Sequence, residues 1–165
     1  MNYLKITYPD INNGLGFRVT LWVAGCSHHC VGCHNSWTWD YDLGEKLENC
    51  KEELFNALAL PYIKGLTLSG GDPLAQSDEN LKELRELILE VKEKFPEKDI
   101  WLYAGDKIEE VKEHPYKEMV LELCDYFVDG TFHGREKDLS LAFRGSRNQR
   151  IWKKENDDWI EINLD

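Results

Sequence analysis

The sequence predicts an α/β fold whose parallel core strands form a short, open partial barrel. Apolar runs rich in β-branched and aromatic residues alternate with segments whose apolar residues recur at helical spacing, which is typical of βαβ units. A complete eight-fold barrel needs about 250 residues, whereas this chain has 165. We therefore expect a single domain over residues 1–165 with too few strands to close.

The composition indicates a cytoplasmic globular domain. Hydrophobic residues make up 42% of the chain, which supplies a core for a domain that buries roughly 70% of its unfolded surface. The formal net charge of −11 argues against a nucleic-acid surface, because phosphate neutralisation needs concentrated Lys and Arg. A membrane-spanning helix needs about twenty apolar residues, and no apolar run in the sequence approaches this length. The first residues do not resemble a signal peptide. The five cysteines are therefore expected to be metal ligands or free thiols.

The first two elements are expected to be strands. Residues 3–8 indicate a short edge strand that is ended by Pro9 and Asp10. Residues 17–24 read F-R-V-T-L-W-V-A, which predicts a strand buried on both faces. Gly25 then allows the chain to turn sharply into a cysteine-rich loop.

The segment after this loop is expected to cover it and then to form a helix. An aromatic cluster that would pack over the loop and exclude water consists of Trp37, Trp39 and Tyr41. Asp42 and the glutamate three residues later form a capping-box pattern, which predicts a helix start. An apolar stripe at helical spacing follows up to Pro61 and consists of Leu47, Cys50, Leu54 and Leu58. Because Cys50 lies on this stripe, it is expected to be a buried core thiol.

A glycine-rich turn follows the next predicted strand, which covers residues 65–69. Gly70, Gly71 and Asp72 lie between the carboxyl end of this strand and a helix, where open α/β sheets bind ligands. Glycines at such a turn allow the backbone to approach a ligand closely. The turn is therefore a candidate ligand site.

The remaining elements continue the alternation of helices and strands. Further strands are expected over residues 99–104, 125–130, 149–153 and 159–163. One helix is expected to be capped by Ser77 and stopped by Pro96. Another begins with a capping box at Asp106 and Glu109, breaks at His114 and Pro115, and resumes as far as Leu123. Cys124, which follows this helix, is interpreted as structural.

Cys26, Cys30 and Cys33 are the candidate metal ligands. Their spacing is C-x3-C-x2-C within eight residues, close enough to converge on one metal centre. Thiolates suit iron–sulfur clusters, zinc and Cu(I). An all-cysteine [4Fe–4S] cluster uses four thiolates, whereas this loop supplies three. One iron of such a cluster would lack a protein ligand and could bind a substrate.

The cysteine spacing and four other motifs together resemble the radical S-adenosylmethionine (SAM) superfamily. Within it, Cys33-His34-Asn35 is similar to the loop of glycyl-radical activases, and the stretch over residues 144–149 favours the activating proteins of anaerobic (class III) ribonucleoside-triphosphate reductases. The other motifs, which extend along the whole chain, are Asn13-Gly14-Leu15-Gly16-Phe17-Arg18, Ser69-Gly70-Gly71-Asp72-Pro73, Val128-Asp129-Gly130 and Arg144-Gly145-Ser146-Arg147-Asn148-Gln149. Two positions differ from the superfamily pattern: Gly32 stands where many members carry an aromatic residue, and Asp72 where many carry Glu.

The resemblance implies a truncated, open (β/α) partial barrel of the radical SAM type that acts as a glycyl-radical activase. The open iron would chelate SAM, and the SAM-binding residues would be Gly32, Cys33, His34, Gly70, Gly71 and Asp72. Reduction of the cluster would cleave SAM to methionine and a 5′-deoxyadenosyl radical, which abstracts hydrogen from a glycine of the partner. The implied partners are the large subunit of the anaerobic reductase and an external electron donor such as flavodoxin. The protein would form a homodimer or a heterotetramer with the reductase. Homolysis needs no acid, base or nucleophile, so no such catalytic residue is expected.

Three alternatives stay open at the level of the sequence. The cysteines and His34 could form a structural Cys3His zinc site, for which His28 and His29 offer further nitrogen. A closed electron-transfer cluster could instead use Cys50 or Cys124 as its fourth ligand. A third alternative is a radical SAM enzyme that acts on a small molecule, such as a deazapurine precursor.

The charge is unevenly distributed along the chain. Between residues 134 and 154 there are seven basic residues and two acidic ones, a local net charge of +5. A solvated face is the usual outcome for such a run. The alternative is a docking surface for an acidic partner or for an anionic part of a ligand.

Overall fold

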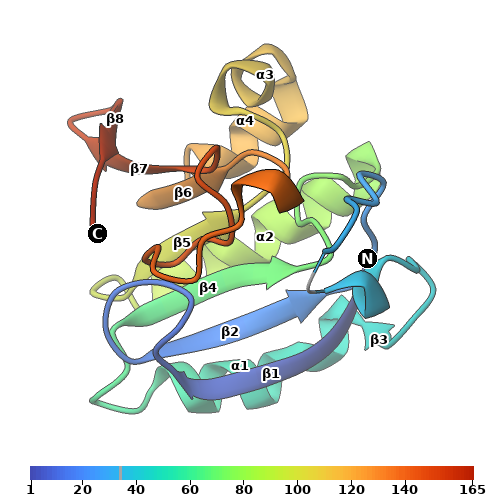
Figure 1. Cartoon of the computed structure of the whole chain (residues 1–165). Coiled ribbons are helices and arrows are strands. Elements are labelled where there is room, and N and C mark those ends of the chain that lie inside the picture. Colours follow the sequence, from blue (N-terminus) through green and yellow to red (C-terminus); the bar gives the residue numbers. More distant parts are fainter. Residues whose placement is uncertain (34) are drawn as a thin grey trace.

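The structure is a computed structural model that describes residues 1–33 and 35–165. Within these residues, eight strands form one mixed sheet in the order β3-β1-β2-β4-β5-β6-β7-β8 (Figure 1). The strands are β1 (Asn2–Asp10), β2 (Arg18–Val23), β3 (Glu45–Lys46), β4 (Gly65–Gly70), β5 (Asp99–Tyr103), β6 (Tyr126–Asp129), β7 (Arg150–Glu155) and β8 (Asp158–Ile162).

The core of the sheet is parallel. Strands β2, β4, β5 and β6 run in the same direction, whereas β1, β3, β7 and β8 pair antiparallel on the two flanks. The predicted α/β class and the predicted parallel core strands are therefore confirmed. Because parallel strands end at the same edge, the loops after β2, β4, β5 and β6 meet at one side of the molecule.

In the part of the chain that the structure describes, four α-helices and three short 3₁₀-helices connect the strands. They are η1 (Ser36–Thr38), η2 (Leu47–Cys50), α1 (Lys51–Leu58), α2 (Asp78–Lys94), α3 (Ile108–Glu113), α4 (Pro115–Leu121) and η3 (Gly134–Glu136). Ser77 caps α2 as predicted, since its Oγ accepts a hydrogen bond of 3.2 Å from the Asn80 N–H. The predicted break at His114 and Pro115 is also confirmed, because α3 ends at Glu113 and α4 begins at Pro115. None of the helices in the described ranges has the length and apolar character needed to cross a membrane.

The two faces of the central strands contact different layers. Along β2, the side chains of Val19, Leu21 and Val23 belong to the main apolar core, which also contains the buried residues of α1 and α2. Alternate residues point to the opposite, inner face, because side chains alternate along a strand. The inner face contains Thr20, Thr67, Ser69, Trp101 and Tyr103, and loops cover it. Figure 1 shows the loop between β6 and β7 crossing this face.

Arg18 fills the amino end of the inner face. Its guanidinium spans across β4 to Asp99, with 2.6 Å between Nη2 and Oδ1. The register aligns Arg18 with Gly65 and Gly65 with Asp99, so a glycine lies between the two charged residues. A side chain at Gly65 would collide with the Asp99 carboxylate and with the guanidinium. The amino end of the inner face is therefore closed by protein groups.

The predicted helix start at Asp42 is wrong. The segment instead forms β3, which pairs with β1, and α1 begins only at Lys51. Gly44 has a φ of +78°, and a Cβ at this position would collide with the Tyr3 carbonyl. Pairing with the amino-terminal strand therefore overrides the local helix signal at Asp42.

Two smaller expectations also need correction. Strand β1 is not the edge of the sheet, since β3 pairs outside it, and β1 continues through Pro9 to Asp10. The capping box of α3 lies one residue later than predicted, because the Glu110 carboxylate accepts a hydrogen bond of 3.0 Å from the Lys107 N–H. Asp106 therefore does not cap the helix, and its carboxylate contacts His28 and Lys117.

Candidate functional site

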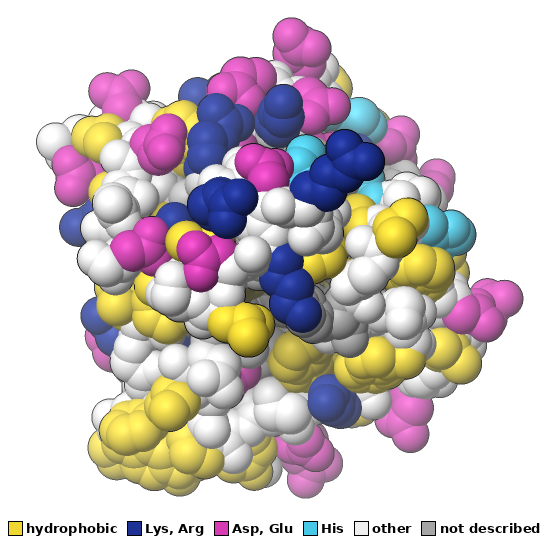
Figure 2. Space-filling view, in the orientation of Figure 1, with side chains coloured by type: hydrophobic (Ala, Val, Ile, Leu, Met, Phe, Trp, Pro, Cys, Tyr) yellow, Lys and Arg dark blue, Asp and Glu magenta, His cyan; other side chains and the backbone are white. Residues whose placement is uncertain are grey.

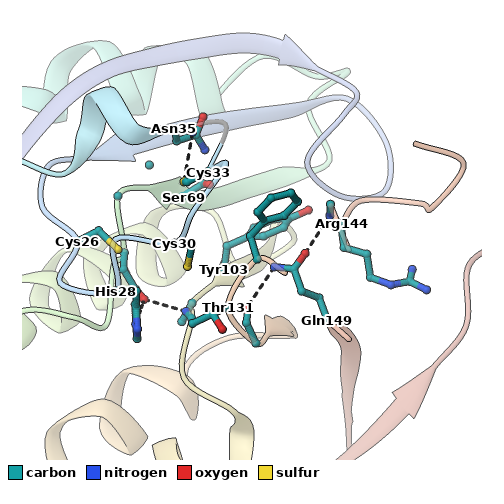
Figure 3. A pocket seen from close by; sticks show the side chains of 18 of the residues that line it. Cys26, His28, Cys30, Cys33, Asn35, Ser69, Tyr103, Thr131, Arg144 and Gln149 are labelled. Atoms are coloured by element: carbon teal, nitrogen blue, oxygen red, sulfur yellow. Dashed lines mark hydrogen bonds and ion pairs between the residues drawn. The ribbon is translucent and has the colours of Figure 1, made fainter. Parts of the chain in front are cut away.

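A cavity of about 420 Å³ lies at the carboxyl ends of the parallel strands. This volume lies within the roughly 300–1,000 Å³ that is usual for ligand pockets. The cavity is open to solvent on one side and is lined by residues from every parallel strand end (Figure 3). The lining includes Cys26, Cys30 and Cys33 together with Ser69, Gly70, Gly71 and Asp72. The structure thus brings the two motifs predicted to be functional to one site.

The cysteine loop leaves β2 at Gly25 and is fixed by the segment that follows it. Gly25 has a φ of +101°, which favours glycine, and its N–H donates to the Thr38 carbonyl at 2.7 Å. The N–H of Cys26 donates to the carbonyl of Trp39 at 3.2 Å. The loop therefore pairs with the aromatic segment predicted to cover it.

The three aromatic residues of that segment pack on different neighbours. Trp39 stacks on His29, with 4.4 Å between ring centroids and 18° between the ring planes. The ring of Tyr41 lies against Gly25, and its hydroxyl donates to the Ala75 carbonyl at 2.6 Å. Trp37 lies 6.4 Å from the Trp22 ring and remains 47% exposed. Trp39 and Tyr41 therefore cover the loop as predicted, whereas Trp37 contacts the adjacent strand.

Burial opposes ionisation of the cysteine thiols. Loss of solvation raises the pKa of Cys26 to about 11, while hydrogen bonds with the backbone of His28 and His29 partly oppose this rise. Burial also raises the pKa of Cys30, and a hydrogen bond with the Phe132 backbone counteracts it. Each of these thiols would be protonated at neutral pH in the absence of a metal. Metal binding would therefore displace protons.

The donor set fits an iron–sulfur cluster. In the described part of the chain, no group of three His, Cys, Asp or Glu side chains is placed to hold a single metal ion. A cluster of several irons and sulfides is larger, so its thiolates lie around a cavity wall as Cys26, Cys30 and Cys33 do. The backbone N–H of Asn35 lies 3.4 Å from the Cys33 sulfur, a hydrogen bond of the kind that tunes cluster potentials.

The other two cysteines lie outside the cavity. Cys50 is fully buried and Cys124 is 1% exposed, and both belong to the main apolar core. Burial raises the pKa of Cys50 to about 11 and raises that of Cys124 even further. The interpretation of both residues as core thiols is therefore consistent with their positions.

The turn after β4 is held mainly by contacts within the protein. A Cβ at Gly70 would collide with the Val23 backbone, and one at Gly71 would collide with the Gly25 backbone. The two glycines are thus needed where the end of β4 approaches the start of the cysteine loop. Asp72 is 2% exposed, and its carboxylate accepts hydrogen bonds from the N–H groups of Leu74 and Gly105, each at 2.8 Å.

The opposite wall of the cavity comes from the segment between β6 and β7. Gln149 holds this wall together, since its Oε1 accepts from the Gly145 N–H at 2.9 Å and its Nε2 donates to the Gly130 carbonyl at 3.0 Å. Asn148 adds a hydrogen bond of 2.8 Å to the Thr131 carbonyl. Residues 144–149 were identified from the sequence only through the family resemblance. The amide side chains of Asn148 and Gln149 were the only local sign of a structured loop.

Two predicted SAM-binding residues flank Cys33 in the sequence. A Cβ added to Gly32 would lie 3.4 Å from the ring of Phe132. The segment between β6 and β7 therefore places an aromatic side chain beside this glycine. Phe132 also lines the cavity. His34, the other predicted residue, lies outside the described residues.

The basic carboxyl-terminal stretch divides into paired and exposed side chains. Ion pairs engage Arg144 with Asp165, Arg150 with Glu109 and Asp129, Lys153 with Glu155, and Lys154 with Glu122. Arg135, Lys137 and Arg147 are exposed. Figure 2 shows Lys and Arg side chains over the loops that follow β6. Most of the excess charge therefore serves internal contacts, and a smaller exposed group lies near the cavity wall.

Comparison with known proteins gives a consistent result. The family model described as "4Fe-4S single cluster domain" matches residues 12–152. The chain is 44% identical over 162 residues to the anaerobic ribonucleoside-triphosphate reductase-activating protein of Enterobacteria phage T4, covering 96% of this chain and 98% of the relative. It is 40% identical over 154 residues to the activating proteins of Haemophilus influenzae and of Escherichia coli strain K12, covering 92% of this chain and 97% of each relative.

These relatives are matched over nearly their whole length, and the 4Fe–4S family model includes all three cysteines and the turn at Gly70, Gly71 and Asp72. The zinc-module alternative has no such support. The chain belongs to the family of anaerobic ribonucleoside-triphosphate reductase-activating proteins.

Proposed function

We propose that this chain is a radical SAM enzyme that generates a glycyl radical on the large subunit of an anaerobic ribonucleoside-triphosphate reductase. The observation that carries the proposal is that the three cysteines and the glycine-rich turn line the same cavity. The names of the relatives supply the reductase as the partner. The open mixed sheet would be a truncated radical-SAM-type partial barrel, and residues 1–165 would act as one domain.

Cys26, Cys30 and Cys33 would hold a [4Fe–4S] cluster and leave one iron for SAM. Cys50 and Cys124 are buried in the core, away from the cavity. The Nε2 atom of His28 contacts Asp72, and the ring of His29 stacks on Trp39. The burial of Cys50 and Cys124 and the contact of His28 with Asp72 support an open fourth position.

When reduced by one external electron, the bound cluster would cleave the carbon–sulfur bond of SAM to methionine and a 5′-deoxyadenosyl radical, which takes a hydrogen atom from the partner's glycine and leaves a glycyl radical. The protein residues would bind and orient SAM. The carboxylate of Asp72 is used within the protein, so the turn at Gly70 and Gly71 would contact SAM through its backbone. Cys33 and Gly32 border the same space, where Phe132 supplies an aromatic ring. His34 completes the proposed set.

The open side of the cavity is where a polypeptide substrate would enter. Val31 and Leu139 are 91% and 87% exposed, and Arg135 and Arg147 are exposed on the segment that forms the cavity wall. We assign this rim to the reductase. Replacing both arginines by glutamate should weaken reductase binding and leave SAM cleavage intact, and an unchanged affinity would remove the assignment.

The protein would operate in the cytoplasm with an electron donor such as flavodoxin, as a homodimer or in a heterotetramer with the reductase.

The test of the proposed function is anaerobic reconstitution with iron and sulfide, followed by reduction and addition of SAM. We expect 5′-deoxyadenosine from the wild-type protein, none from Cys30→Ala, and a glycyl radical signal when the reductase is added. Cys50→Ser and Cys124→Ser are matched controls that should keep the cluster. A colourless protein with stoichiometric zinc would refute the proposal, whereas turnover of a small molecule without reductase would favour the other radical SAM alternative.

A further inference from the structure

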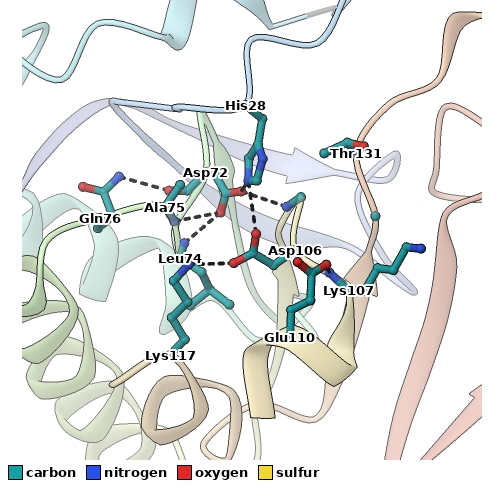
Figure 4. Close-up of polar contacts among 12 residues, drawn as sticks. His28, Asp72, Leu74, Ala75, Gln76, Asp106, Lys107, Glu110, Lys117 and Thr131 are labelled. Carbon is teal, nitrogen blue, oxygen red and sulfur yellow. Dashed lines mark hydrogen bonds and ion pairs between the residues drawn. The ribbon is translucent and has the colours of Figure 1, made fainter. Parts of the chain in front are cut away.

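His28 connects the cysteine loop to the ends of two other strands. The residue lies between Cys26 and Cys30 in the sequence, and its imidazole points toward Asp72 and Asp106 (Figure 4). The Nε2 atom lies 2.9 Å from Oδ2 of Asp72 and 3.6 Å from Oδ1 of Asp106. These distances describe an ion-pair contact that ties the loop after β2 to the turns after β4 and β5.

The groups that receive His28 are themselves fixed. The Asp72 carboxylate is held by the N–H groups of Leu74, Ala75 and Gly105, at 2.8, 3.2 and 2.8 Å. The Asp106 carboxylate is held by Lys117 of α4, with 2.6 Å between Oδ2 and Nζ. His28 therefore contacts two carboxylates whose positions are determined by the surrounding fold.

The imidazole also fits closely against Gly105. A Cβ placed on Gly105 would lie 2.6 Å from Cδ2 and 2.7 Å from Nε2 of the His28 ring. Such distances are too short for real atoms, so the ring occupies the space that any side chain at position 105 would need. The loop and the end of β5 are thus matched in shape as well as in charge.

We propose that His28 is a positioning residue, whose imidazole fixes the loop of Cys26, Cys30 and Cys33 against the turn at Gly70, Gly71 and Asp72. The inference rests on the proposed function, because this contact then sets the position of the open iron relative to the turn that binds SAM. It gives the histidine a role other than the metal ligation considered in the zinc alternative. Positioning groups of this kind matter because a small displacement of the reacting atoms lowers both binding and turnover.

The first test compares His28→Ala and His28→Gln with wild type after cluster reconstitution. SAM affinity is read from the change in the electron paramagnetic resonance signal of the reduced cluster. We expect His28→Ala to weaken SAM binding about tenfold while the iron content stays unchanged. Loss of a group that supports a metal site typically costs about 10–100-fold, and the expected effect is at the lower end of this range. His28→Gln keeps an N–H donor for Asp72 and should restore most of the affinity. The control is His133→Ala, which removes an exposed imidazole that pairs with Glu136 outside the cysteine loop and should leave SAM affinity unchanged.

The second test uses the iron-free protein and does not depend on SAM. Amide hydrogen exchange is measured at Cys26 and Cys33, whose N–H groups donate to the carbonyls of Trp39 and Cys30. His28→Ala should accelerate exchange at these two amides and leave the amides of α2 unchanged. Equal exchange in His28→Ala and wild type would overturn the inference.

A double-mutant cycle separates the contact from a general loss of structure. Gly105→Ala should displace the ring and weaken SAM binding by itself, whereas in His28→Ala it should have little further effect, because the ring is absent. Additive effects on SAM affinity would contradict the proposal. Failure of the wild-type protein to bind SAM would refute the proposed function, and the exchange experiment would still decide the role of His28.

Discussion

The two ends of the parallel strands carry similar contacts that serve different purposes. At the amino end, Arg18 pairs with Asp99 at 2.6 Å, and the guanidinium is fully buried. At the carboxyl end, His28 pairs with Asp72 at 2.9 Å beside an open cavity, and the imidazole is 21% exposed. In both places a basic side chain on or after β2 reaches a carboxylate of a neighbouring segment.

The difference lies in what else each basic side chain contacts. Arg18 donates to Thr67 Oγ1 at 2.7 Å and to the carbonyls of Leu15 and Leu66, each at 2.9 Å, so its donors are used within the fold. Burial lowers the pKa of Arg18 and raises that of Asp99, and the ion pair offsets part of both shifts. The amino end therefore contributes to stability, as in complete (β/α) barrels, where the carboxyl ends of the strands carry the active site.

The largest effect on stability is expected from Arg18→Met. This variant leaves the partly buried Asp99 carboxylate without its cation, so the free energy of unfolding should fall by about 3–5 kcal/mol. Urea unfolding of the iron-free protein measures the change. Arg135→Met, at an exposed position, is the matched control and should change stability by no more than about 0.5 kcal/mol.

The same variant tests whether the two ends are independent. Once reconstituted at a temperature where it is folded, Arg18→Met should bind SAM with wild-type affinity, whereas His28→Ala should lose affinity. Adding Asp99→Asn to Arg18→Met should recover part of the lost stability, because the unpaired charge is removed. A loss of SAM affinity in Arg18→Met comparable with that of His28→Ala would contradict the separation of roles.

A smaller effect is expected from Gly65→Ala, which acts on the same ion pair without removing either charge. The new methyl group would collide with the backbone carbonyl and the carboxylate of Asp99 and would meet Nη2 of Arg18 at 2.9 Å, so only part of the clash involves the ion pair. Overpacking of this kind typically costs about 1–3 kcal/mol. Urea unfolding should show this loss in the wild-type background and a smaller one in Arg18→Met, where Met can move aside. An equal loss in both backgrounds would show that Gly65 does not act through the pair.

The sequence predicted the parts of the fold that depend on local patterns. The buried β2 and β4 strands are recognisable as short β-branched runs, and the spacing of Cys26, Cys30 and Cys33 indicates a loop around one centre. The position of the turn at Gly70 beside that loop follows from parallel strand order. These features require only periodicity, spacing and topology.

Contacts between distant segments were beyond sequence reasoning. The capping pattern at Asp42 is locally sound, but pairing of Glu45 and Lys46 with β1 prevents the helix. The reason for Gly65 appears only when Arg18 and Asp99 are brought into register on either side of it. His28 could be identified only as a possible ligand, because its two carboxylate partners come from the ends of β4 and β5.

The smallest effect is expected from Glu109→Gln, at an exposed ion pair on the carboxyl side. Hydrogen bonds from Arg150 lower the pKa of Glu109 to about 2, but the side chain is 62% exposed. Solvent screening limits such a pair to about 0.2–1 kcal/mol, and Arg150 keeps its 2.6 Å contact with Asp129 in the variant.

The pH dependence follows from the direction of that shift. Because the pKa of Glu109 is lower in the folded state, ionised Glu109 stabilises the fold above about pH 5, and this contribution disappears as the pH falls toward about 2. The difference in unfolding free energy between wild type and Glu109→Gln should therefore be small at pH 7, smaller still in high salt, and absent in acid. A difference larger than that of Gly65→Ala, or one that persists in acid, would mean that the carboxyl end contributes more to stability than its exposed contacts indicate.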